Sequence, residues 1–339
     1  MSKVSVNSNI SAKDFKRRVC VAPMMDWTDR HDRYFLRQIT QHTLLYTEMV
    51  TTGAVIHGDR EKLLGYNDCE HPVAVQLGGG DPQELAQAAE VSESYGYDEI
   101  NLNVGCPSDR VQRGKIGACL MAEPELVASC VKAMINSVSV PVTVKCRTGV
   151  DELDSYEHLS SFIQQVSDAG CQTFIIHARK AWLSGLSPKQ NREIPPLHYD
   201  RVYAIKRDFP HLEIIINGGI TSLEQSQEHL NYVDGVMIGR EAYQNPYLLA
   251  SVDRLFYGDS THPGSREEVA MSMIDYIDRH LEKGGKLNHI TRHILGLFYS
   301  QPGGRLWRRY LSEHATQPGA GSDVVRSALD AIRTKEVAV

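Results

Sequence analysis

The chain has 339 residues, of which 42% are hydrophobic and 23% are charged, a composition typical of a globular protein with room for one large and one smaller domain. No apolar run approaches the roughly 18 residues that a membrane-spanning helix needs, and the polar segment Met1–Lys13 has no apolar centre. We therefore expect neither a membrane partner nor a secretory signal. The net charge of −6 argues against binding nucleic acid through overall charge alone.

The cysteines indicate the compartment. There are seven, an odd number, and no two have the spacing of a CxxC pair. This pattern argues against a zinc site and against a disulfide framework, so we expect no bound metal. Free thiols are typical of a reducing environment, which predicts a cytoplasmic protein.

Eight short runs rich in Val and Ile divide the first 240 residues. Each has an apolar core of four to seven residues, which is typical of a strand buried on both faces. The predicted strands are Arg18–Met24, Leu44–Val50, Pro72–Gly78, Glu99–Gly105, Val140–Arg147, Thr173–Arg179, Glu213–Gly219 and Gly235–Arg240. Residues 1–17 are expected to form a flexible tail, and residues 18–256 the domain that contains these strands.

The spacing of the strands predicts the fold. Successive strands start 22 to 41 residues apart, and intervening segments such as Asp81–Tyr95 have helical spacing with an Asp cap followed by Pro. Eight such units predict an α/β fold, the (β/α)8 or TIM barrel, whose functional residues lie at the C-terminal ends of the strands. A doubly wound sheet competes, but Gln83 stands where a GxGxxG motif starting at Gly78 requires its last glycine.

The pattern changes after Arg240. Tyr257–Ser265 is a boundary rich in Gly, Pro and Ser, and residues 260–339 are predicted to form an all-helical domain. The predicted helices lie near Arg266–Lys283, Leu287–Ser300, Arg305–Ala315 and Ser322–Lys335. Between positions 286 and 314 five Lys and Arg face a single acidic residue, a local charge of +4 that favours contact with phosphates, although a solvated basic face explains it equally well.

Glycines mark the last two strand ends. Asn217-Gly218-Gly219 and Gly239-Arg240 follow the seventh and eighth strands, where barrels commonly bind phosphate. Glycine lets backbone N–H groups approach phosphate oxygens, and Arg240 adds a positive charge. Either turn alone is explained by a need for positive φ. Together, in these two positions, they predict a phosphate site.

Four further strand ends carry candidate residues. Cys106 follows the fourth strand, before the glycine-bearing loop Ser108–Gly117, and a thiol that is mostly protonated at neutral pH can donate a proton. Lys145 lies near the end of the fifth strand, where it can stabilise negative charge on a reduced flavin. The alternatives are a solvated lysine for Lys145, a core histidine for His177 and a strand cap for Gln76. For Cys106 the rival role is nucleophilic catalysis, but the sequence places no His or Asp beside it.

Nine stretches of the chain closely resemble the tRNA-dihydrouridine synthases, and specifically their A subgroup. They are APMMDWTDRHDRYFLR, YTEMVTTGA, PVAVQLGG, DEINLNVGCPSDRVQ, PVTVKCRTG, FIIHARKAWLSGLSPKQNREIPPL, INGGI, DGVMIGREAYQNP and HITRHILGLF. The resemblance extends from about Cys20 onward. It implies an FMN-binding barrel with a helical tRNA-binding domain, in which NADPH reduces FMN and the flavin delivers hydride to C6 of a uridine.

The resemblance also implies roles for individual residues. Cys106 matches the cysteine that protonates C5 of the uridine, and Asn103 and Arg147 match uracil recognition. The positions that match FMN contacts are Pro23, Met24, Met25, Gln76, Lys145, His177, Asn217, Gly218, Gly219, Gly239 and Arg240. Lys189, Arg192, Arg305 and Arg308 match tRNA contacts. Uridines 20 and 20a of the D-loop are the substrates that the A subgroup implies, and the target base has to leave its stack.

Two other functions stay open at this point. The first is a flavin barrel that reduces a free pyrimidine or another enone, which has no use for a basic helical domain. The second is an RNA-binding protein that is not an enzyme. No obligate protein partner is predicted, and with no dinucleotide fingerprint the sequence does not indicate where NADPH docks.

Overall fold

The computed structural model of the chain describes residues 15–108 and 114–337. Most of the expected flexible tail, and part of the expected loop Ser108–Gly117, lie outside these ranges. No helix within them is long and apolar enough to cross a membrane.

Eight parallel strands close into a barrel in the order of the sequence, because the last strand pairs with the first. They are β1 (Val19–Val21), β2 (Leu44–Thr51), β3 (Val73–Gly78), β4 (Glu99–Asn103), β5 (Val142–Arg147), β6 (Thr173–His177), β7 (Glu213–Asn217) and β8 (Gly235–Ile238). The predicted (β/α)8 barrel is confirmed, and each strand starts within two residues of its predicted start.

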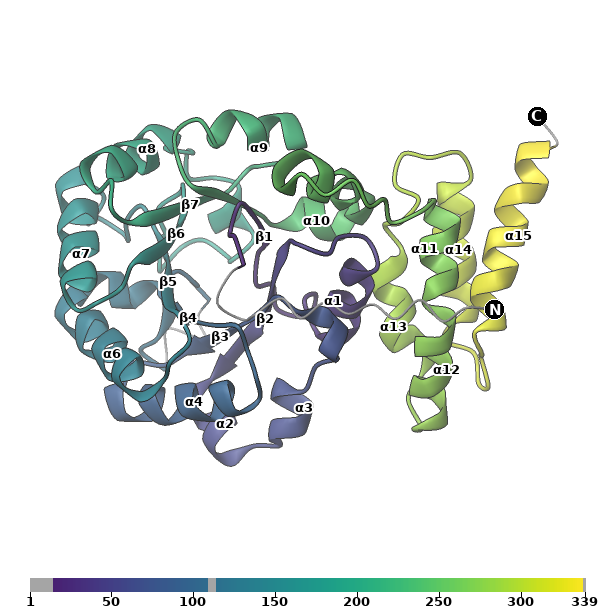
Figure 1. Cartoon of the computed structure of the whole chain (residues 1–339), viewed down its shortest axis with the longest axis horizontal. Coiled ribbons are helices and arrows are strands. Elements are labelled where there is room, and N and C mark those ends of the chain that lie inside the picture. Colours follow the sequence, from purple (N-terminus) through teal and green to yellow (C-terminus); the bar gives the residue numbers. More distant parts are fainter. Residues whose placement is uncertain (1–14, 109–113, 338–339) are drawn as a thin grey trace.

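Helices between the strands cover the outside of the barrel (Figure 1). They are α1 (Arg30–Arg37), α2 (Thr52–His57), α3 (Arg60–Leu64), α4 (Pro82–Ser94), α6 (Pro124–Ser137), α7 (Tyr156–Asp168), α8 (Tyr199–Asp208), α9 (Leu223–His229) and α10 (Arg240–Gln244). The expected cap of α4 is present, since the Asp81 carboxylate accepts hydrogen bonds from two backbone N–H groups of the first turn.

The barrel interior is divided into an apolar and a polar part. A small cluster of buried side chains fills the apolar part: Cys20, Ala22, Leu44, Tyr46, Ala74, Ile175, Ile215 and Met237. The polar part is formed by β3, β4 and β5, which bury Gln76, Glu99, Asn101, Asn103 and Thr143. Buried polar groups are tolerated only when they are hydrogen-bonded, so these side chains have to bond to one another.

Arg17 corrects the expected boundary of the flexible tail. Its Nε donates to the buried carboxylate of Glu99 at 2.5 Å, and its NH1 donates to Glu213 at 2.8 Å. Both acidic residues start their strands, so Arg17 lies at the N-terminal end of the barrel. The buried carboxylate of Glu99 needs a cation, and sequence composition alone does not show which residue supplies it.

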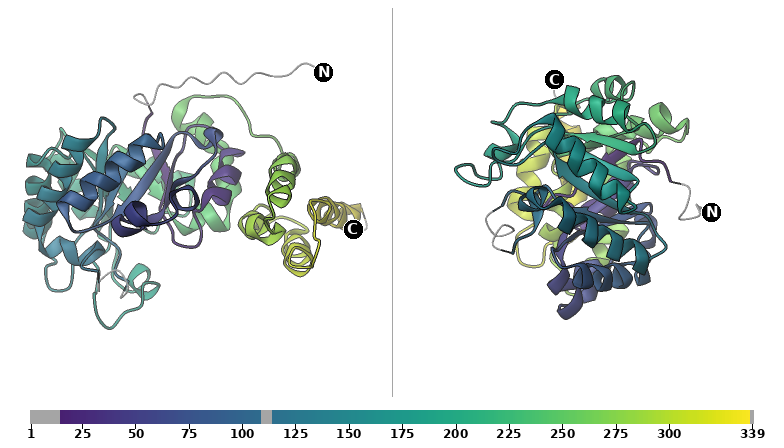
Figure 2. Two further views of the ribbon diagram at one scale, coloured as in Figure 1. Left: turned by 90° about the horizontal axis from the view of Figure 1, so that it is seen from below. Right: turned by 90° about the vertical axis from the view of Figure 1, so that its left-hand side faces the viewer.

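The helices after the barrel form a group beside it, as Figures 1 and 2 show. They are α11 (Arg266–Ser272), α12 (Ile274–Glu282), α13 (Leu287–Ile294), α14 (Gly304–His314) and α15 (Asp323–Val337). The single helix predicted over Arg266–Lys283 is divided at Met273 into α11 and α12. Trp307 of α14 is fully buried.

The two parts of the molecule meet where α1 lies against α13. Asp29 caps α1 by accepting from two backbone N–H groups, and it also accepts from Arg292 at 2.5 Å and from His293 Nε2 at 3.1 Å. Tyr243 of α10, which stacks on Trp27, also meets the His293 ring of α13 edge-on, with ring centroids 5.7 Å apart. The barrel and the helical region therefore share a junction that is both polar and aromatic.

Candidate active site

The C-terminal ends of all eight strands open into one cavity of about 1510 Å³. Fifteen of the residues singled out from the sequence line it: Pro23, Met24, Met25, Gln76, Asn103, Cys106, Lys145, Arg147, His177, Arg192, Asn217, Gly218, Gly219, Gly239 and Arg240. Lys189, Arg305 and Arg308 do not line it, and all three are exposed. The expected site is thus gathered at one end of the barrel, while the basic helix α14 lies elsewhere.

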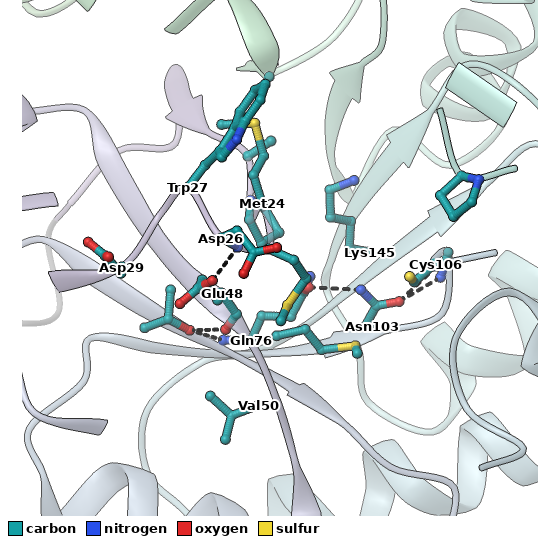
Figure 3. A pocket seen from close by; sticks show the side chains of 18 of the residues that line it. Met24, Asp26, Trp27, Asp29, Glu48, Val50, Gln76, Asn103, Cys106 and Lys145 are labelled. Carbon is teal, nitrogen blue, oxygen red and sulfur yellow. Dashed lines mark hydrogen bonds between the residues drawn. The ribbon is translucent and has the colours of Figure 1, made fainter. Parts of the chain in front are cut away.

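Cys106 is partly buried, and its backbone is held by Asn103. The Oδ1 atom of Asn103 accepts from the N–H of Cys106 at 2.9 Å and from that of Gly105 at 3.1 Å. The other side of this amide donates from Nδ2 to Gln76 Oε1 at 2.8 Å (Figure 3). The thiol also lies close enough to Lys145, Arg147 and Arg192 for their charges to interact with it.

Lys145 extends from β5 into the cavity and donates from Nζ to Asn217 Oδ1 at 3.1 Å. The amide of Asn217 is held in this orientation because its Nδ2 donates to the Met237 carbonyl at 2.7 Å. Burial, and then the charge of Arg147, lowers the pKa of Lys145 to about 8. The ammonium is therefore charged at neutral pH but close to losing its proton.

His177 and the glycines after β7 lie together. Gly218 and Gly219 have φ values of +112° and +73°, and the Tyr199 hydroxyl donates to the Gly218 carbonyl at 2.7 Å. A side chain at Gly218 would lie 3.2 Å from the His177 ring. The buried Nδ1 of His177 has no hydrogen-bond partner within the described residues, and burial followed by the charge of Arg147 lowers the pKa of this ring well below its usual value. It is a neutral ring whose Cε1–Nε2 edge lies beside the glycine turn.

Arg147 was expected to recognise uracil, but much of its guanidinium is used inside the protein. Nε donates to the Gly105 carbonyl at 2.8 Å, and NH1 donates to the carbonyls of Lys180 and Asn191 at 3.0 and 3.1 Å. Arg147 therefore links the backbone next to Cys106 to the loop after β6. The second terminal nitrogen has no such bond among the described residues and remains available to a bound group.

Sequence reasoning missed Asn191, which organises the same loop. Its fully buried side chain donates to the carbonyls of Trp182 and Leu186 and accepts from the N–H of Trp182 at 2.8 Å. The long segment Lys180–Tyr199 is therefore a structured element that places Arg192 at the cavity. A polar residue within a long loop gives no signal in sequence that separates this role from solvent exposure.

The wall formed after β1 is connected to the helical region. Asp26 has a φ of +64°, its N–H donates to the Glu48 carboxylate, and its carbonyl accepts from Arg292 of α13 at 3.0 Å. Figure 3 shows Asp26 and Glu48 joined in this way at the cavity. Burial and the nearby Asp29 raise the pKa of Glu48. A hydrogen bond therefore links the cavity wall directly to α13.

The sequence matches the model of one protein family, described as dihydrouridine synthase, over residues 20–333. The chain belongs to this family. The match includes the helices after the barrel as well as the barrel itself, so the two parts belong to one conserved architecture.

Similar curated proteins cover the chain almost completely. A protein of Shewanella oneidensis is 61% identical over 338 residues, which is 100% of both chains, and one of Escherichia coli K12 is 60% identical over 339 residues, or 99% of this chain and 98% of the other. Both are named tRNA-dihydrouridine(20/20a) synthase.

A solved structure of 2-naphthoyl-CoA reductase superposes with a TM-score of 0.52 at 11% identity. The superposition covers 69% of this chain and 49% of the reductase chain. At this identity the likeness concerns the fold alone.

Proposed function

We propose that this protein reduces uridine to 5,6-dihydrouridine in the D-loop of tRNA, at positions 20 and 20a, with FMN as cofactor and NADPH as reductant. The observation that carries the proposal is the convergence of Cys106, Lys145 and His177 with the glycine turns after β7 and β8 in one cavity. The near-identical length and 60% identity to proteins named for this reaction support it.

The cavity residues fit a flavin mononucleotide. The His177 ring beside the Gly218-Gly219 turn, together with Gly239 and Arg240, suits a phosphate, since glycine turns expose N–H groups and Arg240 adds charge. Lys145 and Gln76 would hold the ring system, and Pro23, Met24, Met25 and Asn217 would complete the pocket. When bound, FMN supplies hydride to C6 of uracil after its reduction by NADPH.

Cys106 would supply the proton that C5 of the uracil requires. Its thiol lies in the same cavity as Lys145, and Asn103 fixes the backbone from which the side chain extends. One remaining N–H of Asn103 and the free end of Arg147 would bind the base at its edge. General acid catalysis needs the donor held at a fixed position, and the bonds to Asn103 achieve this.

The tRNA would contact both parts of the molecule. Arg192 lies at the cavity and Lys189 on the exposed loop next to it, while Arg305 and Arg308 are exposed on α14. A base has to be extruded from its stack to reach a cavity at the end of a barrel. We propose residues 260–339 as the tRNA-binding domain and residues 18–256 as the catalytic domain.

The test is to react the purified protein with unmodified tRNA and NADPH and to map dihydrouridine by mass spectrometry. We expect dihydrouridine at positions 20 and 20a, and loss of the product in Cys106→Ala with FMN and tRNA binding retained. Turnover of free uracil without turnover of tRNA would favour the alternative enone reductase. Near-normal turnover by Cys106→Ala would refute the proton-donor role.

A further inference from the structure

Three side chains of β4 point into the barrel one after another: Glu99, Asn101 and Asn103, which are 0%, 0% and 8% exposed. Side chains on one face of a strand recur every second residue, so the three form a column from the N-terminal end of the barrel to the cavity. A column of polar groups in a protein interior costs free energy unless each group has a partner. Their hydrogen bonds are continuous.

The lower part of the column is organised by the Glu99 carboxylate. Arg17 donates to Oε2 at 2.5 Å, while Tyr46 and Thr143 donate their hydroxyl protons to Oε1 at 2.5 and 2.7 Å. A carboxylate paired with an arginine only accepts hydrogen bonds. Thr143 therefore has to donate to Glu99 and keeps its oxygen lone pairs for the next group, the amide of Asn101, which donates from Nδ2 at 2.8 Å.

The upper part continues in the same direction. Gln76 Nε2 donates to Asn101 Oδ1 at 2.8 Å. Asn103 Nδ2 in turn donates to Gln76 Oε1 at 2.8 Å, the bond drawn in Figure 3. Asn103 Oδ1 is then left facing the N–H groups of Gly105 and Cys106. Every donor points toward Glu99 and every amide oxygen points toward the cysteine, so a reversed amide at any step would place two donors or two acceptors in contact.

We propose that this hydrogen-bonded column, which we name the β4 ladder (Glu99, Thr143, Asn101, Gln76 and Asn103), sets the orientation of the Asn103 amide and so positions Cys106 for the reaction. Thr143 and Asn101 are positioning residues: they do not line the cavity, and they act on Cys106 only through Gln76 and Asn103. The inference rests on the proposed role of Cys106, because positioning matters for turnover only if the thiol takes part.

The test interrupts the ladder at its middle with Thr143→Val, which keeps the shape of the side chain and removes the hydroxyl. Asn101 then loses its acceptor, and Gln76 and Asn103 lose the constraint on their orientation. Weakening the bonds that hold the backbone N–H groups of Gly105 and Cys106 should lower kcat about tenfold with KM for tRNA unchanged. Thr143→Ser keeps the hydroxyl and should restore kcat.

A second measurement does not depend on activity. Alkylation of Cys106 by iodoacetamide, followed by chymotryptic peptide mapping, should become about threefold faster in Thr143→Val because the loosened segment opens to the reagent. Cys69 is exposed and lies outside the ladder, so its rate is the internal reference. Thr143→Ala, which places no methyl group against Glu99, serves if the valine variant does not fold.

The matched control is Thr173→Val. Thr173 is also a buried threonine that donates to a carboxylate, Glu213, at 2.9 Å, but it has no bond to the ladder amides. The proposal is overturned if Thr143→Val and Thr173→Val show the same kcat and the same Cys106 alkylation rate as the wild type. Normal turnover in Cys106→Ala would reject the proton-donor role instead, and the alkylation rates would still decide whether the ladder holds the cysteine.

Discussion

At the scale of one residue, Lys145 shows that a side chain of the candidate site can lower the stability of the fold. Its ammonium is held in the barrel by an amide oxygen rather than by a carboxylate, and Arg147 adds a second positive charge nearby. Burial of a cation without a counter-ion lowers its pKa, here to about 8. Such a charge has no structural use, but it suits a site that must stabilise an anion.

Replacing this lysine should therefore make the protein more stable. The pKa of Lys145 is lower in the folded state than in the unfolded state, so its charge costs stability below pH 8, and the cost disappears as pH rises toward 10.5. We expect Lys145→Met to raise the free energy of unfolding by about 1–3 kcal/mol at pH 7 in urea titrations of the protein without cofactor, and to abolish turnover. The exposed Lys132→Met is the control. A loss of stability at pH 7 would contradict the argument.

Alanine substitutions can distinguish the structural roles of the glycines after β7 and β8. Alanine at Gly218 requires φ near +112° and a contact with the His177 ring, whereas a side chain at Gly239 meets nothing within 4 Å. Gly218→Ala should cost about 1–3 kcal/mol of stability, and Gly239→Ala almost none. Both should weaken FMN binding, measured by quenching of flavin fluorescence. Unchanged FMN affinity in Gly239→Ala would show that the turn after β8 does not bind the phosphate.

At the scale of elements, the strands were predictable because each combines an apolar run with a polar or glycine end. What sequence did not reveal were contacts between distant segments: Arg17 with Glu99, Arg147 with three carbonyl groups, and Asn191 within its loop. Such contacts depend on the closure of the barrel, which local patterns do not encode. The break at Met273 was missed because the apolar stripe continues across it.

The junction of α1 with α13 should respond to acid. His293 is buried against Asp29, and burial lowers the pKa of this histidine, so the folded state keeps it neutral. Because the unfolded state binds the proton more readily, stability falls as pH drops below about 6.5, by up to about 1.4 kcal/mol per pH unit. The lowered pKa of Asp29 adds stability that is lost only at still lower pH.

We expect the urea concentration at the unfolding midpoint to be lower at pH 5 than at pH 7. At pH 5 Trp27 should also become exposed to solvent at a lower urea concentration, which fluorescence would report. His293→Asn removes the titrating group and should reduce this dependence on pH. The exposed His262→Asn is the control. The same slope in His293→Asn as in the wild type would show that other groups are responsible.

At the scale of the whole molecule, the protein carries a net negative charge, and we propose that it binds tRNA, a polyanion. The tRNA must therefore be attracted by a patch of basic residues rather than by the overall charge. Arg305 and Arg308 are exposed on the basic helix α14. Arg305→Ala and Arg308→Ala should each weaken tRNA binding and lower the slope of log K against log salt by about 1. Arg326→Ala on α15 is the control for a basic residue outside this helix. An unchanged slope in both variants would mean that neither contacts a phosphate.

Point variants are better suited to this question than removal of residues 260–339. Without α13, Asp29 and the buried Asp32 would lose His293, and Asp26 would lose Arg292. A truncated chain would therefore lose part of its cavity wall together with any contact to tRNA. Weak binding by such a chain would not show which of the two was responsible.

The pairing of α1 with α13 also bears on how the protein is made. On the ribosome α1 emerges more than 250 residues before α13. The carboxyl groups of Asp29 and Asp32 therefore lack their contacts with His293 until synthesis is nearly complete. The contacts between α1 and α13 therefore form only when the end of the chain has been delivered. A nascent chain stalled before residue 293 would lack them, although all eight strands had already been translated.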